Sequence, residues 1–200
     1  MAKLQNVTRA HLGLLLANLV WAVNYPFYKV LMPHYITPVA LATFAVTVAG
    51  LLGLVSLFWG GIEKIDRNDI YKFIGAALLM GIAKKLLLMI GMQHTSPIEA
   101  SIIATLGPIL VLVFSFFFGI DRFTPMKVFG MVLGMGGALL VILSGGGAVT
   151  SGEKLMGNLF VVGAIAASSF SMVWLKGLIM KYRPITVLRV YYPMAAVMLL

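Results

Sequence analysis

Long apolar runs, separated by short polar joints, make up almost the whole chain. An α-helix needs about 20 consecutive apolar residues to cross the hydrocarbon core of a bilayer. The runs that reach this length cover residues 11–31, 38–59, 71–93, 98–118, 125–143 and 155–179. A further run begins near Ile185 and is still apolar at Leu200, where the sequence stops. The pattern predicts an all-α polytopic membrane protein with six complete transmembrane helices and a truncated seventh.

The joints between the runs agree with these boundaries. They read IEKIDRN at 62–68, TSP at 95–97, GIDRFT at 119–124 and GGGAVTSGEK at 145–154. Proline lies near several predicted helix starts, where its missing N–H costs little: Pro38, Pro97, Pro125 and Pro184. Pro108, in contrast, lies inside the predicted fourth span and is expected to kink it.

Composition excludes several other classes of protein. Charged residues make up 10% of the chain and hydrophobic residues 61%, whereas a soluble domain carries about 25% charged residues. The chain has no cysteine, which excludes disulfides, thiolate metal sites and cysteine nucleophiles. The net charge of +9 is compatible with nucleic-acid binding, but the charges lie between apolar runs and form no continuous patch. We therefore expect a lipid bilayer as the surroundings and no nucleic acid as a partner.

The distribution of Lys and Arg predicts the orientation of the chain. With the N-terminus in the cytoplasm, the positive residues on the inner side are Lys3, Arg9, Lys64, Arg67, Lys72, Arg122, Lys127, Lys176, Lys181, Arg183 and Arg189. Only Lys29 and Lys154 then lie outside, while Lys84 and Lys85 fall within a span. Because positive residues favour cytoplasmic loops, this predicts a multi-pass protein of the cytoplasmic membrane with a cytoplasmic N-terminus.

A weak internal repeat joins the two parts of the chain. The stretch KVLMPHYITPVAL from Lys29 resembles KGLIMKYRPITVL from Lys176, and the offset aligns Tyr35 with Tyr182. This offset also places the sixth predicted span on the first. A unit of five spans is odd, so its second copy enters the membrane inverted, as in many secondary transporters. The expected organisation is inverted five-helix repeats, with a first repeat at 1–146 and a linker plus incomplete second repeat at 147–200.

Three motifs, in order, carry a resemblance to a known family. They are WAVNYPFYK at 21–29, TSPIEASIIATLGPILVLVFS at 95–115 and GIDRFTPMKVFG at 119–130. The set resembles the EamA-like drug/metabolite transporter family over essentially the whole chain. Asp121 and Lys127 depart from the Glu and Gln usual in the third motif, and the Lys84–Lys85 pair is unusual for the third span.

The resemblance implies ten helices around a central cavity lined by helices one to four and six to nine. Because the chain stops within its seventh span, we expect a fragment or truncated product of a ten-helix protein. The implied function is that of a secondary transporter moving a small metabolite by alternating access, with no cofactor. The alternative is a truncated, non-transporting membrane stub with a structural or regulatory role. A homodimer is compatible with either.

The lysine pair is the first candidate for a solute site. Lys84 and Lys85 lie nearer the middle of the third span than either end, where a lysine costs about 2.5–3.5 kcal/mol to insert. Neighbouring helix positions differ by about 100°, so both need not face one way. One of them could face the cavity and bind an anionic or zwitterionic solute. The alternative is an internal partner such as Glu99 or a helix C-terminus.

Three further residues are candidates for substrate binding. Glu99 could couple protons, pair with Lys84, or simply interact favourably with the N-terminus of its helix. Trp21 and Asn24 share one face of the first helix, where they could form a solute-binding wall or serve packing and an interhelical hydrogen bond. Pro26, in the same span, frees one backbone carbonyl.

Other features favour structure or exclude chemistry. Gly130, Gly134 and Gly137 form a ridge of small residues typical of helix packing. Metalloprotease, hydrolase and P-loop motifs are absent from the sequence, and its three histidines lie far apart. We therefore expect neither an enzyme nor a metal site.

Overall fold

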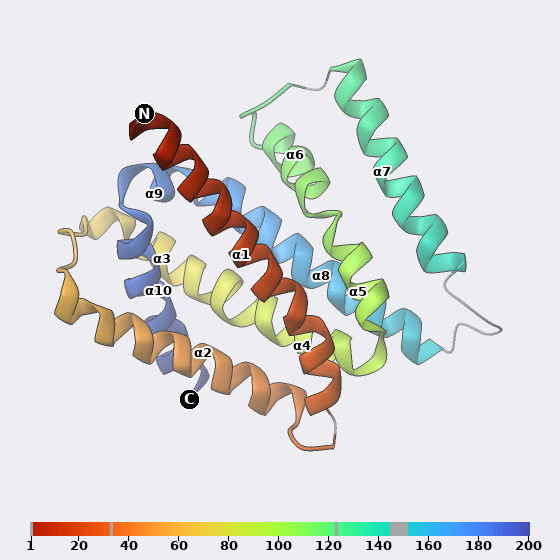
Figure 1. The fold of residues 1–200 in the computed structure, drawn as a ribbon, viewed down its shortest axis with the longest axis horizontal. Helices are drawn as coiled ribbons and strands as arrows, with labels where there is room; N and C mark the ends of the chain where they lie inside the picture. Colours follow the sequence, from red (N-terminus) through yellow and green to blue (C-terminus); the bar gives the residue numbers. More distant parts are fainter. Residues whose placement is uncertain (1, 33, 123, 145–151) are drawn as a thin grey trace.

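A computed structural model describes residues 2–32, 34–122, 124–144 and 152–200, and these residues form helices without any strand (Figure 1). The longer helices are α1 (Ala2–Leu31), α2 (Pro38–Val55), α4 (Lys84–His94), α6 (Gly107–Phe117), α7 (Pro125–Ser144), α8 (Gly152–Trp174) and α10 (Pro184–Leu199). The shorter ones are η1 (Ser56–Trp59), η2 (Arg67–Asp69), α3 (Ile70–Ala76), η3 (Ala77–Ala83), α5 (Pro97–Ala104) and α9 (Lys176–Lys181).

Five continuous stretches among the described residues are long and apolar enough to cross a membrane. They are His11–Leu31, Pro38–Trp59, Arg67–His94, Pro97–Phe117 and Gly152–Trp174. They correspond to the first four predicted spans and the sixth. Helix α7 lies at the fifth predicted span and the shorter α10 at the seventh run. An all-helical, multi-pass fold is thereby confirmed, whereas six complete spans with inverted repeats stay predictions.

Proline and side-chain caps determine where several helices begin. Helices α2, α5, α7 and α10 all start at the prolines expected from the sequence. The backbone N–H of Ala40 donates to the Thr37 hydroxyl at 3.3 Å, and that of Glu99 donates to the Ser96 hydroxyl at 3.2 Å. Each hydroxyl satisfies an N–H that the first turn leaves unpaired.

Two of the spans are irregular near their middle. The third contains a π-helix, η3, directly before Lys84. The fourth breaks at Thr105 and Leu106, whose N–H groups turn back to the carbonyls of Ile102 and Ile103, and α6 then starts at Gly107–Pro108. The expected kink at Pro108 is therefore present as a break between α5 and α6.

Close backbone contact fixes the centre of the molecule. Helices α4 and α8 share the most extensive packing, and a Cβ on Gly91 would lie 2.8 Å from the carbonyl oxygen of Gly157. Only glycine permits this approach. Of the predicted ridge on α7, only Gly134 meets another described residue closely, at Ile109 of α6. Helix α7 thus lies at the edge of the molecule (Figure 1).

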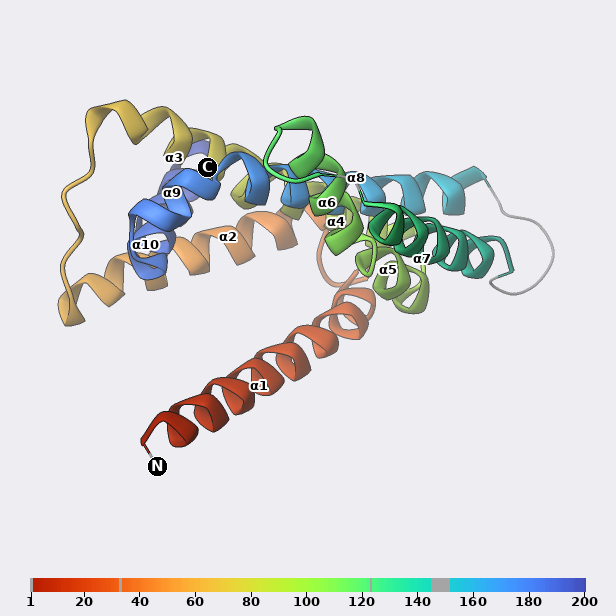
Figure 2. The ribbon, with the colours of Figure 1, turned by 90° about the horizontal axis from the view of Figure 1, so that it is seen from above.

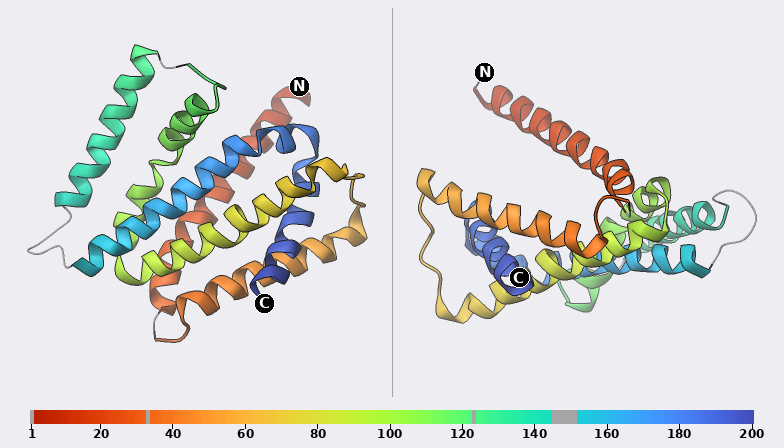
Figure 3. Two further views of the ribbon diagram at one scale, coloured as in Figure 1. Left: turned by 180° about the vertical axis from the view of Figure 1, so that it is seen from behind. Right: turned by 90° about the horizontal axis from the view of Figure 1, so that it is seen from below.

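Helix α1 diverges from the other helices (Figures 2 and 3). Its C-terminal end lies against the bundle, whereas its N-terminal half extends away from it. The chain direction of α8 is opposite to that of α1 in both views of Figure 3. Any chain whose six successive spans each cross the membrane has this relation between the first and the sixth, so the inverted repeat stays a prediction.

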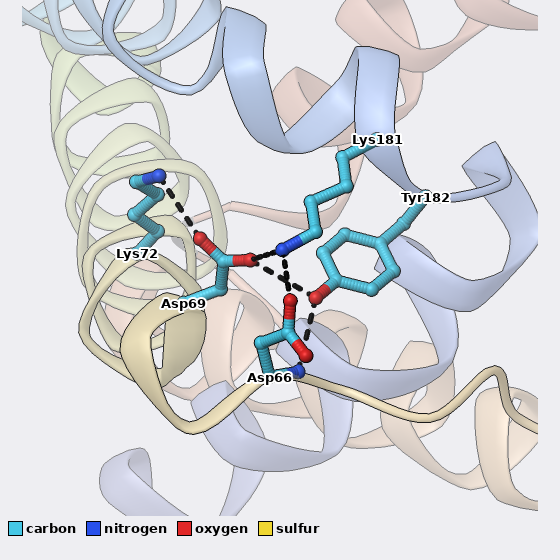
Figure 4. A network of polar contacts seen from close by, with 5 residues as sticks. All are labelled: Asp66, Asp69, Lys72, Lys181 and Tyr182. Atoms are coloured by element: carbon cyan, nitrogen blue, oxygen red, sulfur yellow. Dashed lines mark hydrogen bonds and ion pairs between the residues drawn. The ribbon is translucent and has the colours of Figure 1, made fainter.

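A polar network joins the connection after α2 to the end of α9 (Figure 4). The Lys181 ammonium contacts Asp66 and donates to Asp69 at 2.6 Å, and Lys72 donates to the same Asp69 carboxylate at 3.0 Å. The Tyr182 hydroxyl donates to Asp69 at 3.0 Å and accepts from the backbone N–H of Asp66 at 3.1 Å. Hydrogen bonds to Asp66 and Asp69 raise the pKa of Lys181. The network fixes one end of the bundle in a defined arrangement.

Arg189 has a similar structural role beside this network. Its side chain is 9% exposed, and its guanidinium donates to the Ser56 hydroxyl at 2.8 Å and the Ser56 carbonyl at 2.6 Å. It also donates to the carbonyls of Gly60 and Gly61. These acceptors lie at the end of the second span, so Arg189 ties α10 to the unpaired carbonyls there.

Candidate functional site

The described helices line an open-sided cavity of about 1200 Å³. Helices α1, α2, α8 and α10 and the third and fourth spans contribute to it, and its walls are mostly apolar. The polar and aromatic residues in its lining are Asn18, Trp21, Asn24, Tyr25, Tyr28, Lys84, Lys85, Ser101, Ser168, Ser169, Tyr191 and Tyr192. Apolar walls with a few converging polar groups are typical of sites for small molecules.

Both lysines of the predicted pair line this cavity, although they are adjacent in sequence. The Lys84 ammonium lies 5.4 Å from the centre of the Trp21 ring. The Lys85 ammonium lies 5.3 Å from the centre of the Tyr28 ring and donates to the Tyr28 hydroxyl at 3.1 Å. Because an aromatic face attracts a cation, α1 supplies a partner for each lysine.

The lining carries positive charge that no carboxylate offsets. Neither Asp nor Glu occurs among the described residues of the cavity wall. The carboxylates of Asp66 and Asp69 bind Lys181, and that of Asp121 binds Lys127. The hydrogen bonds from Lys127 and from the backbone N–H of Arg122 lower the pKa of Asp121. These three acids therefore serve contacts elsewhere, while the cavity lysines face aromatic rings.

Glu99 lies outside the cavity lining. It is buried, with 3% of its surface exposed, and its carboxylate pairs with Lys154 at 2.6 Å. The Thr95 hydroxyl donates to the other carboxylate oxygen at 3.0 Å and also contacts Asn158. The sequence-based alternative that Lys84 pairs with Glu99 is therefore wrong, because Glu99 binds Lys154 and Lys84 meets Trp21.

The remaining candidates on the first helix do belong to the cavity. Trp21 and Asn24 line it, as does Pro26. The sequence interpretation missed Tyr28, although its position seven residues after Trp21 places it on the same helix face. It also missed Tyr191 and Tyr192, whose rings stack with their centres 4.3 Å apart. Only the packing of α10 against α2 and the third span brings this tyrosine pair into the cavity.

Metal-ligating residues do not gather anywhere in the part of the chain that the structure describes. No group of three or more His, Cys, Asp or Glu residues there could hold a metal ion. The described site is therefore one of cationic, aromatic, hydroxyl and amide groups.

Comparison with known proteins gives a family match. The model of the EamA-like transporter family matches residues 8–143. An uncharacterized transporter of Archaeoglobus fulgidus is 26% identical over 153 residues, which cover 76% of this chain and 52% of the relative. The uncharacterized transporter YvbV of Bacillus subtilis is 27% identical over 177 residues, covering 87% of this chain and 54% of the relative. The chain spans about half the length of these relatives. No solved structure gives a significant match.

Proposed function

Because the chain belongs to the EamA-like transporter family, we propose that it forms the solute-binding part of a secondary transporter. The transporter moves a small metabolite across the cytoplasmic membrane by alternating access. The observation that carries this proposal is the cavity with Lys84 and Lys85 in its wall and no described carboxylate beside them. A lysine in mid-membrane is expensive and marks a functional site by default.

The proposed solute is anionic or zwitterionic. Removing an ammonium from water is unfavourable unless an opposite charge or several hydrogen bonds replace the water. An aromatic face offsets only part of this, by about 0.5–2 kcal/mol. A carboxylate or phosphate on the solute would supply the missing charge, and a cation would be repelled.

The rest of the lining suits an organic body attached to such a charge. Asn24, Ser101 and Ser168 offer hydrogen-bonding groups, while Tyr191 and Tyr192 offer aromatic surface. The first repeat, 1–146, and the incomplete second repeat within 147–200 would rock about this site. The site would lie near the membrane midplane, as in other inverted-repeat carriers.

A ligand-stability screen with matched solutes tests the proposal. The protein is purified in lipid nanodiscs, and its thermal unfolding is followed with a panel of metabolite carboxylates and with the methyl ester of each. A ligand that binds only the folded state raises the unfolding temperature. We expect at least one carboxylate to do so and its ester to be much weaker.

Two variants with matched controls complete the screen. Lys84→Met and Lys85→Met keep the volume of the side chain and remove its charge, so each should reduce the shift caused by the carboxylate. Lys64→Met and Lys127→Met alter lysines outside the cavity and should leave that shift unchanged. A shift of equal size for acid and ester, or one preserved in the double Lys84→Met/Lys85→Met variant, would contradict the proposed site.

A further inference from the structure

Lys29 closes the WAVNYPFYK motif of the first helix, yet it does not line the cavity. Its ammonium instead reaches the end of α4. It donates to the backbone carbonyls of Met92 at 3.3 Å, Gln93 at 3.1 Å and Thr95 at 3.0 Å. The residue that ends this motif thus has a defined partner outside the solute site.

The contact is favourable for two reasons. The last carbonyls of an α-helix have no partner within the helix, and the C-terminal end carries partial negative charge. Helix α4 ends at His94, so Lys29 from α1 supplies both the missing donors and a compensating charge. The same ammonium holds three acceptors at once.

Packing around Lys29 holds the C-terminal end of α1 in place. Met32 is 1% exposed and belongs to the core formed with α4, α5 and α8. Tyr25, Tyr28 and Leu31 pack against that core from α1. This end of the helix is therefore attached through apolar packing as well as through Lys29.

The N-terminal half of α1 is attached much less. Every described residue from His11 to Val23 is exposed, and only α4 and α5 make more than marginal contact with α1. Figure 2 shows this half leaving the bundle. The Trp21 ring, within the exposed stretch, meets the Lys84 ammonium. Pro26, which follows this exposed stretch and precedes Lys29, removes one backbone hydrogen bond of the helix.

We propose that α1 is a moving wall of the cavity and that Lys29 is the pivot about which it swings. The C-terminal end of α1 stays on α4 through Lys29, while its N-terminal half opens and closes the cavity. The contact between the Trp21 ring and Lys84 yields first, because an aromatic face holds an ammonium less firmly than three carbonyls do. Lys29 is thus a positioning residue, and its role does not depend on which solute the cavity takes.

Distance measurements between spin labels test the pivot without any ligand. The chain has no cysteine, so labels attach only to introduced ones. One pair, Leu16→Cys with Leu52→Cys, joins the exposed part of α1 to α2. The other, Val30→Cys with Val39→Cys, joins the anchored end of α1 to the start of α2. All these positions are more than half exposed. Pulsed electron resonance on the protein in nanodiscs then gives the distribution of each distance.

We expect a broad or split distribution for the Leu16–Leu52 pair and a narrow one for the Val30–Val39 pair. Adding Lys29→Met should broaden the second distribution toward the width of the first. Lys29→Arg should keep it narrow, because a guanidinium can also donate to several carbonyls. The control variant Lys64→Met should change neither.

Either of two results would overturn the pivot. One is that the two distance distributions have equal widths in the protein that keeps Lys29. This comparison needs no substitution at Lys29, so it can be made even if Lys29→Met fails to fold. The other is a Val30–Val39 distribution that Lys29→Met leaves narrow. Because no solute is used, failure here is distinct from failure of the ligand screen.

Discussion

At the residue scale, the cavity lysines are held apart by the first helix. Lys84 and Lys85 follow one another, yet each ammonium meets a different ring, Trp21 or Tyr28, two helical turns apart. Rings attract the cations without neutralising them, so the charge remains available to a ligand. An acidic partner in the same place would have cancelled it.

The Trp21 contact leads to a stability prediction. Trp21→Leu removes the ring that faces Lys84 and should lower the free energy of unfolding by about 0.5–2 kcal/mol. Thermal unfolding in one detergent measures the change. Trp59→Leu is the control, because Trp59 is 81% exposed and lies outside the cavity lining. Equal effects of the two substitutions would show that the ring contact contributes nothing of its own.

A second prediction concerns the network of Figure 4. Asp69→Asn replaces a buried carboxylate that accepts from Lys72, Lys181 and Tyr182, so the unfolding temperature should fall. Asp121→Asn breaks one half-exposed pair, with Lys127, and surface pairs contribute little. Its effect should be clearly smaller, and a reversed order would argue against the network as a structural anchor.

Lys84 and Lys85 were recognisable from sequence because a lysine within an apolar span is costly. Trp21 and Asn24 were recognisable for another reason, since they share one helix face. The partner of Glu99 was not recognisable from sequence. Lys154 lies 55 positions later, in a joint that only helix packing brings close to the fourth span. Aromatic residues such as Tyr191 carry no signal that separates a cavity wall from a core.

At the element scale, glycine governs how closely the helices approach. A Cβ on Gly91 would lie 2.7 Å from the Val161 side chain and 2.8 Å from the Gly157 carbonyl. Backbone cannot move aside as a flexible side chain can. The contact between α4 and α8, which positions the lysine pair, therefore depends on this glycine.

Substituting Gly91 tests that dependence. Gly91→Ala should destabilise the protein by about 1–3 kcal/mol, as overpacking does. Gly163→Ala, on α8, would meet only the Leu87 side chain at 3.6 Å and should be neutral or slightly stabilising because alanine favours helix. Unfolding temperatures of both variants, measured side by side, decide the matter. A loss no larger for Gly91→Ala than for Gly163→Ala would contradict the close α4–α8 packing.

Sequence patterns predicted most helices because apolar runs and prolines report directly on spans and starts. The π-helix η3 was not predicted, since its extra residue leaves no trace in an apolar run such as ALLMGIA. The glycine ridge on α7 stays a prediction, because among the described residues only Gly134 has a close neighbour. Spacing alone does not tell a packing face from a face in contact with lipid.

At the scale of the whole molecule, orientation remains a prediction from the bias of Lys and Arg. Cysteines at Asn68 and Gly152, both exposed, test it with a membrane-impermeant thiol reagent added to intact cells. We expect labelling at Gly152→Cys and none at Asn68→Cys until the membrane is permeabilised. Labelling at Asn68→Cys alone would show that the orientation is the reverse of the predicted one. The cavity would then open to the opposite sides.

The central claim of the account is that Lys84 and Lys85 bind the negative charge of a transported solute. Uptake into proteoliposomes of the carboxylate found in the ligand screen measures this most directly. The protein with both lysines should transport it, and the Lys84→Met/Lys85→Met variant should lose at least tenfold in rate, which corresponds to about 1.4 kcal/mol. The Lys64→Met/Lys127→Met control should transport at the native rate. Native uptake by the folded Lys84→Met/Lys85→Met variant would contradict the account.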